Sequence, residues 1–132
     1  MKSGLNQISE LLDVLNNTVS DSTIVSSLPL CIHEISLDGK LCKMNPAGLK
    51  MLSVGSESNI IGDDYIKYVH TNDSIRILKL LEDATNGITS QFKFKSPNGK
   101  YFSSCFVPII SNNVVKKIVG YTYDITEYYG TR

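Results

Sequence analysis

Histidine and cysteine side chains are the groups in this chain that are best suited to acid–base, nucleophilic or metal chemistry. The chain has two histidines, His33 and His70, and three cysteines, Cys31, Cys42 and Cys105. The cysteine count is odd and no CxxC pair occurs, so the spacing indicates neither a zinc knuckle nor a disulfide framework. All three cysteines lie in stretches that read as strands, which favours inert packing over redox sensing. Without a nucleophile–base constellation or metal-ligand spacing, we expect the chain itself not to be an enzyme.

The tyrosines leave one enzymatic alternative open. Small α+β barrels of similar length isomerise ketosteroids with a Tyr and Asp pair around a cavity, and this chain has seven tyrosines. Most of them cluster in the last strands at alternating positions, as packing would place them. A cavity isomerase is therefore the weaker alternative to a binding module.

The length and charge of the chain exclude several classes of protein. A chain of 132 residues is expected to form one domain with a real core. Thirteen basic and thirteen acidic residues cancel, which argues against nucleic-acid binding through a broad basic surface. No stretch approaches the ~18 apolar residues of a membrane span, and no secretory leader is recognisable. We expect a cytoplasmic protein with no membrane segment in this chain.

Residues 1–25 are predicted to form an amphipathic helix. Their apolar residues recur at steps of three and four, which is typical of one helix face. Such a helix either pairs with a second copy or folds back over its own domain, and we expect it to form a homodimer. The predicted interface residues are Leu5, Ile8, Leu12, Leu15 and Val19.

The rest of the chain alternates between strand and helix patterns. Asn45 and Pro46 are typical of a cap and first turn, which predicts a short helix over 46–52. A longer helix is predicted over 71–87, with Thr71 or Asn72 as its cap and Gly87 at its end. The last two strands are apolar on both alternating faces, so we expect each face of the sheet to be covered. The predicted strands are residues 28–36, 41–45, 90–96, 100–110 and 114–126.

This element order and three stretches of sequence resemble a PAS domain. The stretches are EISLDGKLCKMNPAGLKML (34–52), IGDDYIKYVHTND (61–73) and GYTYDITE (120–127). PAS domains are sensory modules of bacterial histidine kinases, cyclic-dinucleotide enzymes and many regulators. The resemblance implies an α+β fold over residues 26–127: a five-stranded antiparallel sheet with short helices on one face and a small pocket between them. Residues 128–132 would then begin a linker to an effector.

The resemblance also implies a function for the DIT triplet of residues 124–126. In such domains this triplet lies where the last strand passes into a linker, so Asp124 and Thr126 would transfer the signal to an effector, for which we expect a sensor histidine kinase. A short polar side chain there can cap a following helix or bond its own backbone. A ligand-free PAS dimerisation module is the alternative.

The family's alternation of inward and outward residues predicts a pocket lining that is apolar with two hydroxyls. Such a lining suits a small, partly polar ligand and equally an ordinary filled core. A histidine in the pocket could meet a carboxylate ligand or sense pH, or could simply be hydrogen-bonded. The predicted lining residues are His33, Ile35, Met51, Leu78, Phe92, Phe94, Ser104, Phe106 and Thr122.

Two cofactors of the family can be tested against the sequence. Flavin-binding relatives that form an adduct need a cysteine in the stretch that matches residues 55–70, where this chain has none. Haem-binding relatives place a histidine on the long helix, but residues 74–86 contain none and His70 lies before them. The sequence therefore argues against a flavin adduct and disfavours haem, and it names no other cofactor.

Overall fold

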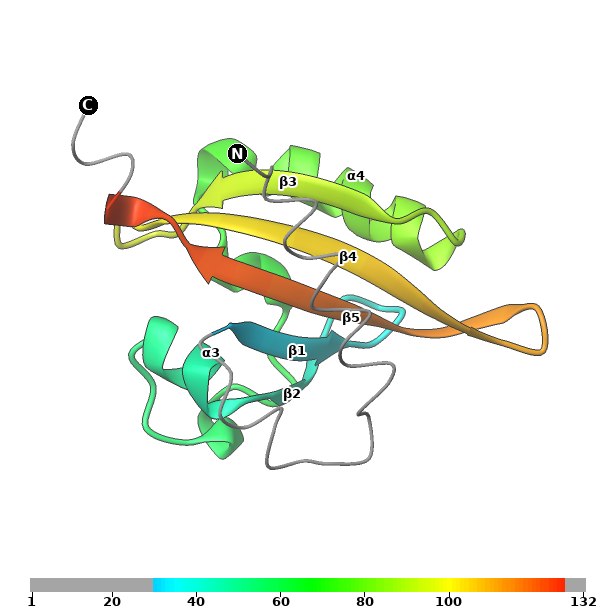
Figure 1. The fold of residues 1–132 in the computed structure, drawn as a ribbon, viewed down its shortest axis with the longest axis horizontal. Helices are drawn as coiled ribbons and strands as arrows, with labels where there is room; N and C mark the ends of the chain where they lie inside the picture. Colours follow the sequence, from blue (N-terminus) through cyan, green and yellow to red (C-terminus); the bar gives the residue numbers. More distant parts are fainter. Residues whose placement is uncertain (1–29, 128–132) are drawn as a thin grey trace.

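A five-stranded antiparallel sheet forms the centre of the protein (Figure 1). The computed structural model describes residues 30–127. The strands are β1 (Cys31–Ile35), β2 (Leu41–Met44), β3 (Ser90–Lys95), β4 (Tyr101–Ser111) and β5 (Val114–Asp124), in the spatial order β2-β1-β5-β4-β3. The predicted α+β fold with a five-stranded antiparallel sheet is thereby confirmed.

The N-terminal prediction falls outside the described part of the chain. Leu5, Ile8, Leu12, Leu15 and Val19 all precede residue 30, where the description begins. The helix over residues 1–25, its role in a homodimer and the linker at 128–132 therefore remain predictions.

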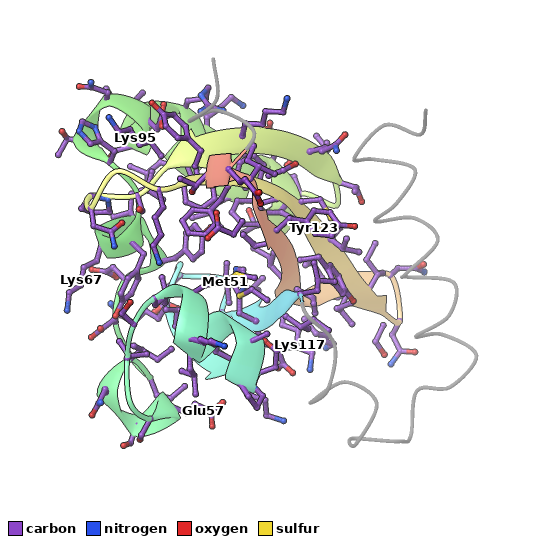
Figure 2. All side chains as sticks on the ribbon, turned by 60° about the vertical axis from the view of Figure 1, so that its left-hand side comes forward. Met51, Glu57, Lys67, Lys95, Lys117 and Tyr123 are labelled. Atoms are coloured by element: carbon purple, nitrogen blue, oxygen red, sulfur yellow. The ribbon has the colours of Figure 1, made fainter. Side chains whose placement is uncertain are left out.

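The helices between β2 and β3 cover one face of the sheet (Figures 1 and 2). They are α3 (Pro46–Met51), the 3-10 turns η1 (Glu57–Asn59), η2 (Tyr65–Tyr68) and η3 (Thr71–Asp73), and α4 (Ser74–Thr85). Between residues 30 and 127, none of the helices has the length and apolar character needed to cross a membrane.

The long helix α4 begins later than predicted. The caps expected at Thr71 or Asn72 are wrong, because these residues form the separate turn η3, whose N-cap is His70. The His70 Nδ1 accepts a hydrogen bond from the Asn72 amide at 3.1 Å. Asp73 follows, and its carboxylate accepts a hydrogen bond from the backbone amide of Lys95 at 2.9 Å, which fixes the start of α4 against β3.

The central strands β4 and β5 are buried on both faces, as predicted. Phe106 and Ile118 pack under the helices, in the larger core between helices and sheet. On the other face lies a second cluster of buried residues, here called the outer-face cluster. It consists of Leu30, Cys105, Val119 and Tyr121, with Ile32, Val107, Ile109 and Tyr123 packed against it.

The pairing of β5 with β4 on one side and with β1 on the other positions the candidate site. The β4–β5 hairpin turns through Asn112 and Asn113, whose φ angles of 53° and 64° suit asparagine in a tight hairpin turn. The turn places β5 beside β4, and β5 also pairs with β1, so it lies in the middle of the sheet. In that register Cys31 lies opposite Thr122.

Candidate functional site

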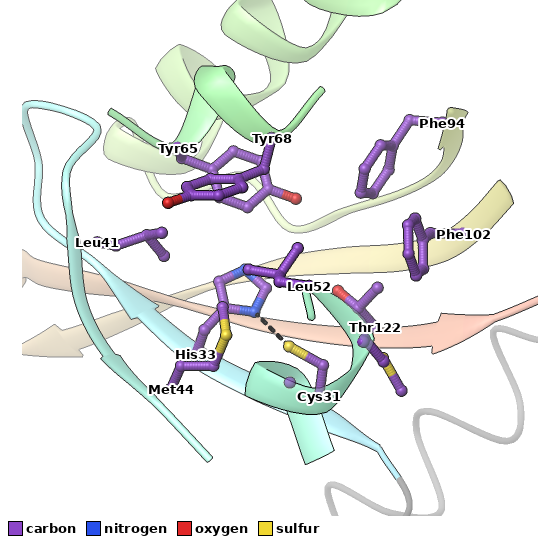
Figure 3. A pocket seen from close by; sticks show the side chains of 12 residues that line it. Cys31, His33, Leu41, Met44, Leu52, Tyr65, Tyr68, Phe94, Phe102 and Thr122 are labelled. Atoms are coloured by element: carbon purple, nitrogen blue, oxygen red, sulfur yellow. Dashed lines mark hydrogen bonds between the residues drawn. The ribbon is translucent and has the colours of Figure 1, made fainter. Parts of the chain in front are cut away.

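A small cavity lies between the sheet and the segments α3 and η2 (Figure 3). Its volume is about 30 Å³. A single water needs at least about 10–15 Å³, whereas sites for organic ligands are roughly ten times larger than this cavity or more. The interior therefore has room for a water molecule or one ion, and an organic ligand would have to open it. The lining residues are Cys31, His33, Leu41, Met44, Gly48, Met51, Leu52, Tyr65, Tyr68, Phe94, Phe102 and Thr122.

A wider recess adjoins the cavity. It has a volume of about 170 Å³ and reaches the turn after β3 at residues 96–98. Four side chains line both hollows: Met51, Leu52, Tyr68 and Phe102. These four side chains form the wall that a molecule entering the cavity from the recess would have to displace.

Two hydrogen bonds hold this wall in place. The Tyr68 hydroxyl donates to Asp63 Oδ2 at 2.6 Å, and Lys100 Nζ donates to the carbonyl oxygen of Met51 at 3.3 Å. Both join the wall to polar groups near the surface. Opening the cavity therefore involves polar contacts as well as apolar packing.

His33 is the polar residue buried most tightly against the cavity. Its exposed fraction is 2%, and its ring stacks on Tyr65 with the ring centroids 5.3 Å apart. Its Nδ1 lies 3.3 Å from Cys31 Sγ, while its Nε2 has no hydrogen-bond partner among the described residues. Burial lowers the pKa of His33 to about 4, so its imidazole is neutral at physiological pH.

The neighbouring strand leaves room for this ring by means of a glycine. Gly120 of β5 lies opposite His33 in the antiparallel register. A Cβ at position 120 would stand 2.2 Å from His33 Nε2, which is far inside van der Waals contact. A histidine at 33 therefore requires a glycine at 120.

The other buried polar groups are neutral. The hydroxyls of Ser104 and Thr122 bond each other at 2.8 Å. Burial raises the pKa of Tyr65 above its ordinary value and raises the pKa of Cys31 to about 12. At neutral pH the region around the cavity thus holds a thiol, a phenol and an imidazole, all without charge.

The structure places the predicted pocket residues in three environments. His33, Met51, Phe94 and Thr122 line the cavity. The prediction for Leu78 is wrong: its exposed fraction is 50%, because α4 turns Ile77, Leu81 and Ala84 toward the sheet. The remaining predicted residues are buried in the core without lining the cavity, and they are Ile35, Phe92, Ser104 and Phe106.

The sequence prediction missed three aromatic residues that line the cavity, Tyr65, Tyr68 and Phe102. Tyr65 and Tyr68 lie in an irregular stretch without periodicity, and only their spacing of three residues hints at a shared face. Phe102 could have been found, because it alternates with Ser104 and Phe106 along β4.

The end of β5 is attached to the start of β4 by the triplet predicted to transfer the signal. Asp124 Oδ1 accepts a hydrogen bond from the Thr126 amide at 2.9 Å. Thr126 Oγ1 accepts one from the Tyr101 amide at 2.9 Å, and the Ile125 amide donates to the Tyr101 carbonyl at 2.9 Å. Tyr101 precedes Phe102, which lies opposite Asp124 in the strand register. The triplet is therefore hydrogen-bonded to Tyr101, the residue directly before Phe102 of the wall between the two hollows.

Residues 30–127 contain no group of three or more His, Cys, Asp or Glu side chains arranged to hold a metal ion. Metal sites built from these residue types alone are therefore not found in the described part of the chain. Donors of another type, the thioethers of Met44 and Met51, line the cavity beside Cys31 and His33.

Because the His33 imidazole is buried, we expect acid to lower the free energy of unfolding. The pKa of His33 is about 4 in the folded chain and about 6.5 when exposed, so between these values only the unfolded chain binds the proton. The stabilising contribution of neutral His33 is fully present above pH 6.5. Below pH 6.5 the free energy of unfolding falls by about 1.4 kcal/mol per pH unit. From pH 6.5 to pH 5 we expect a loss of about 2 kcal/mol in the free energy of unfolding, measured by urea denaturation.

A His33→Gln variant is the matched comparison, since glutamine does not titrate. Its unfolding free energy should change little over the same interval, because the carboxyl groups with a lowered pKa (Asp38, Asp63 and Asp73) lose their stabilising charge at lower pH. An equal decline in both proteins would show that other groups cause it.

The fold matches solved structures, although no protein-family model and no curated protein matches the sequence. The PAS domain of a protein from Colwellia psychrerythraea is 20% identical with a TM-score of 0.66, covering 86% of this chain and 98% of that one. A domain of a protein named as a light and redox sensing histidine kinase, from Haloarcula marismortui, is 13% identical with a TM-score of 0.64, covering 78% and 95%. The N-terminal domain of a diguanylate cyclase with PAS/PAC sensor, from Marinobacter aquaeolei, is 11% identical with a TM-score of 0.64, covering 76% and 98%. The chain therefore has the fold of a PAS domain.

Proposed function

We propose that this chain is the sensory module of a longer signalling protein, and that it passes its signal through the end of β5 to an effector. The hydrogen bond between Thr126 and Tyr101 carries this proposal, because it joins the exit of the sheet to the strand that bears Phe102. A sensor histidine kinase is the effector we propose, in line with the kinase and cyclase parents of the structural matches.

The proposed signal begins at the wall between the cavity and the recess. A molecule that passes from the recess into the cavity has to move the Phe102 side chain, which lines both. Movement of Phe102 shifts the backbone at Tyr101, to which Ile125 and Thr126 are bonded. Each of these hydrogen bonds contributes about 1 kcal/mol, which is enough to change the ratio of two states several-fold.

A ligand-free dimerisation module is the second candidate, and the size of the cavity favours it. At about 30 Å³ the interior is close to a filled core. In that case the signal would come from the partner copy through the predicted N-terminal helix. Native mass spectrometry of the purified protein distinguishes the two, since only the sensor of a small molecule would carry a bound mass.

We also propose that the protein resides in the cytoplasm. The chain has an exposed free cysteine, Cys42, beside the buried Cys31 and Cys105. Exposed free thiols suit a reducing compartment, where they are not oxidised.

The signal-transfer proposal predicts that Thr126→Val uncouples the effector while leaving the domain folded. Valine keeps the shape of threonine but loses the hydroxyl that bonds the Tyr101 amide. We expect a loss of about 1 kcal/mol in unfolding free energy and loss of regulation in the full-length parent. Urea denaturation of the 132-residue chain and autophosphorylation of the parent measure the two effects.

Thr85→Val is the matched control. The Thr126 hydroxyl bonds the backbone of Tyr101, and the Thr85 hydroxyl likewise bonds a backbone group, the Glu82 carbonyl within α4, far from the exit of β5 along the chain. It should cost a similar amount of stability and leave regulation intact. Normal regulation in Thr126→Val as well would show that the triplet merely ends a strand.

A further inference from the structure

Three soft donor groups meet at the cavity. Cys31 and His33 alternate along β1 and therefore face the same side of the sheet, with Sγ and Nδ1 3.3 Å apart. Met44 of β2 lies opposite His33 in the strand register and also lines the cavity. The sheet itself thus places a thiol, an imidazole and a thioether around one point.

Gly48 of α3 lets the two sulfur atoms approach each other. A Cβ at position 48 would stand 2.6 Å from Cys31 Sγ and 2.9 Å from Met44 Sδ, so both sulfurs lie close to this one point. Figure 3 shows the sulfurs of Cys31 and Met44 beside the His33 ring. A side chain at this position would displace the donors, whereas glycine lets both side chains pack against the backbone of α3.

We propose that Cys31 Sγ, His33 Nδ1 and Met44 Sδ form a binding site for a single Cu(I) ion. Thiolate and thioether sulfur together with imidazole are the ligands that select this soft metal ion. The cavity of about 30 Å³ has room for one ion. As a signal, Cu(I) would act through the sensory function proposed above, but the binding itself does not depend on it.

The charge balance favours Cu(I) over zinc. The cavity lining contains no carboxylate and no Lys or Arg side chain. A Cu(I) ion bound to one thiolate forms a neutral unit, whereas Zn(II) with the same ligands would leave a positive charge in an apolar interior. Burying such an uncompensated charge costs several kcal/mol.

Binding exchanges a proton for the metal ion. The S–H bond of Cys31 breaks, the proton passes to solvent and a Cu–S bond forms, with no change in the oxidation state of copper. The Cys31–His33 contact is replaced by bonds from both groups to the metal. His33 Nδ1 lies 3.3 Å from Cys31 Sγ, so the imidazole nitrogen already faces the sulfur that would bind the ion.

Met51 marks the route of entry. Its side chain lines both the cavity and the outer recess, so a thioether stands at the mouth of the site. The ion could pass from Met51 to the three inner donors without losing all its soft ligands at once.

The test is an anaerobic titration of the reduced 132-residue chain with Cu(I), supplied as its acetonitrile complex, against a competing bicinchoninate chelator. All proteins carry Cys42→Ser, which removes the exposed thiol. We expect the chain to retain one Cu(I), Cys31→Ala to lose it, and Met44→Leu to bind roughly tenfold more weakly or worse. Met44→Leu conserves side-chain volume, so the test survives if Cys31→Ala does not fold.

Cys105→Ala is the matched control, because Cys105 is a buried thiol in the outer-face cluster. It should retain Cu(I) like the parent chain. Three results would each overturn the proposal. The first is Cu(I) retention by Cys31→Ala and Met44→Leu that equals retention by the parent chain. The others are transfer of all the copper from the parent chain to the chelator, and binding of Zn(II) by the parent chain that is as tight as binding of Cu(I). Thr126→Val should still bind Cu(I), so failure of the metal site and failure of signal transfer give different results.

Discussion

Gly120→Ala is expected to destabilise the domain by about 3 kcal/mol or more, although alanine normally stabilises a strand relative to glycine. The new Cβ would meet His33 Nε2 at 2.2 Å and Cε1 at 2.4 Å. The ring cannot retreat easily, since it is stacked on Tyr65 and held beside Cys31. Urea denaturation of the two proteins at pH 7 measures the effect.

The cause can be isolated with a second substitution. In a His33→Ala background the same Gly120→Ala change should cost less than about 1 kcal/mol, because the ring that it strikes is gone. Gly55→Ala is the control, since its Cβ would meet no atom within 4 Å, and it should change stability by less than about 0.5 kcal/mol. A cost for Gly120→Ala that is the same with and without the imidazole would refute the steric explanation.

Asn45→Ala is expected to cost about 3 kcal/mol, more than the loss of an ordinary helix cap. Asn45 Oδ1 accepts hydrogen bonds from the Gly48 amide at 3.1 Å and from the Ile32 amide at 2.9 Å. Its Nδ2 donates to the Leu30 carbonyl at 2.7 Å. Alanine would therefore remove the cap of α3 and also leave two backbone groups of the first strand region without this partner.

Two comparisons separate these contributions. Asn45→Asp keeps the acceptor oxygens but cannot donate to Leu30, so its cost should lie between those of the wild type and Asn45→Ala. Ser56→Ala removes an exposed cap whose hydroxyl bonds only the amide and the hydroxyl of Ser58, and it should cost about 1 kcal/mol or less. If Asn45→Ala is no worse than Ser56→Ala in urea denaturation, the link between β1 and α3 contributes little.

The parts of the fold that could be predicted are those encoded by local chemistry. Phe92 and Phe94 alternate with polar residues along β3, and the structure buries both phenylalanines while Gln91 and Lys93 are exposed to solvent. The Asn45–Pro46 pair marked the start of α3, and the two asparagines of the hairpin turn, Asn112 and Asn113, lie in the gap between the predicted strands 100–110 and 114–126. In each case a residue and its immediate neighbours determine the backbone conformation.

The stretch between α3 and α4 could not be predicted, because distant groups hold it. Glu57 Oε2 accepts a hydrogen bond from the Met44 amide at 2.8 Å, and Asp73 accepts one from Lys95 across the sheet edge. Tyr65 is positioned by His33 and Phe106, which are more than thirty residues away in sequence. Three short 3-10 turns built on such contacts carry no periodic signal.

In the candidate site, too, the sequence predicts what local patterns determine and misses what distant contacts determine. Alternation along the strands identified His33, Phe94 and Thr122 as inward-facing residues. The volume of the cavity depends on how Tyr65, Tyr68 and the methionines fill the space above the sheet, and no sequence pattern reports that packing. The sequence therefore predicted an apolar lining, but the small volume of the cavity could be read only from the structure.

The antiparallel pairing of β1 with β5 has an architectural consequence. Cys31, the first residue of β1, lies beside Thr122, two residues before the end of β5. The polypeptide therefore leaves the sheet on the neighbouring strand, two residues beyond the place where it entered. Such a module can be spliced into an elongated protein, or removed from it, with little displacement of the segments on either side. Chains that carry several such modules in series can therefore gain or lose one while the segments on either side keep their relative positions.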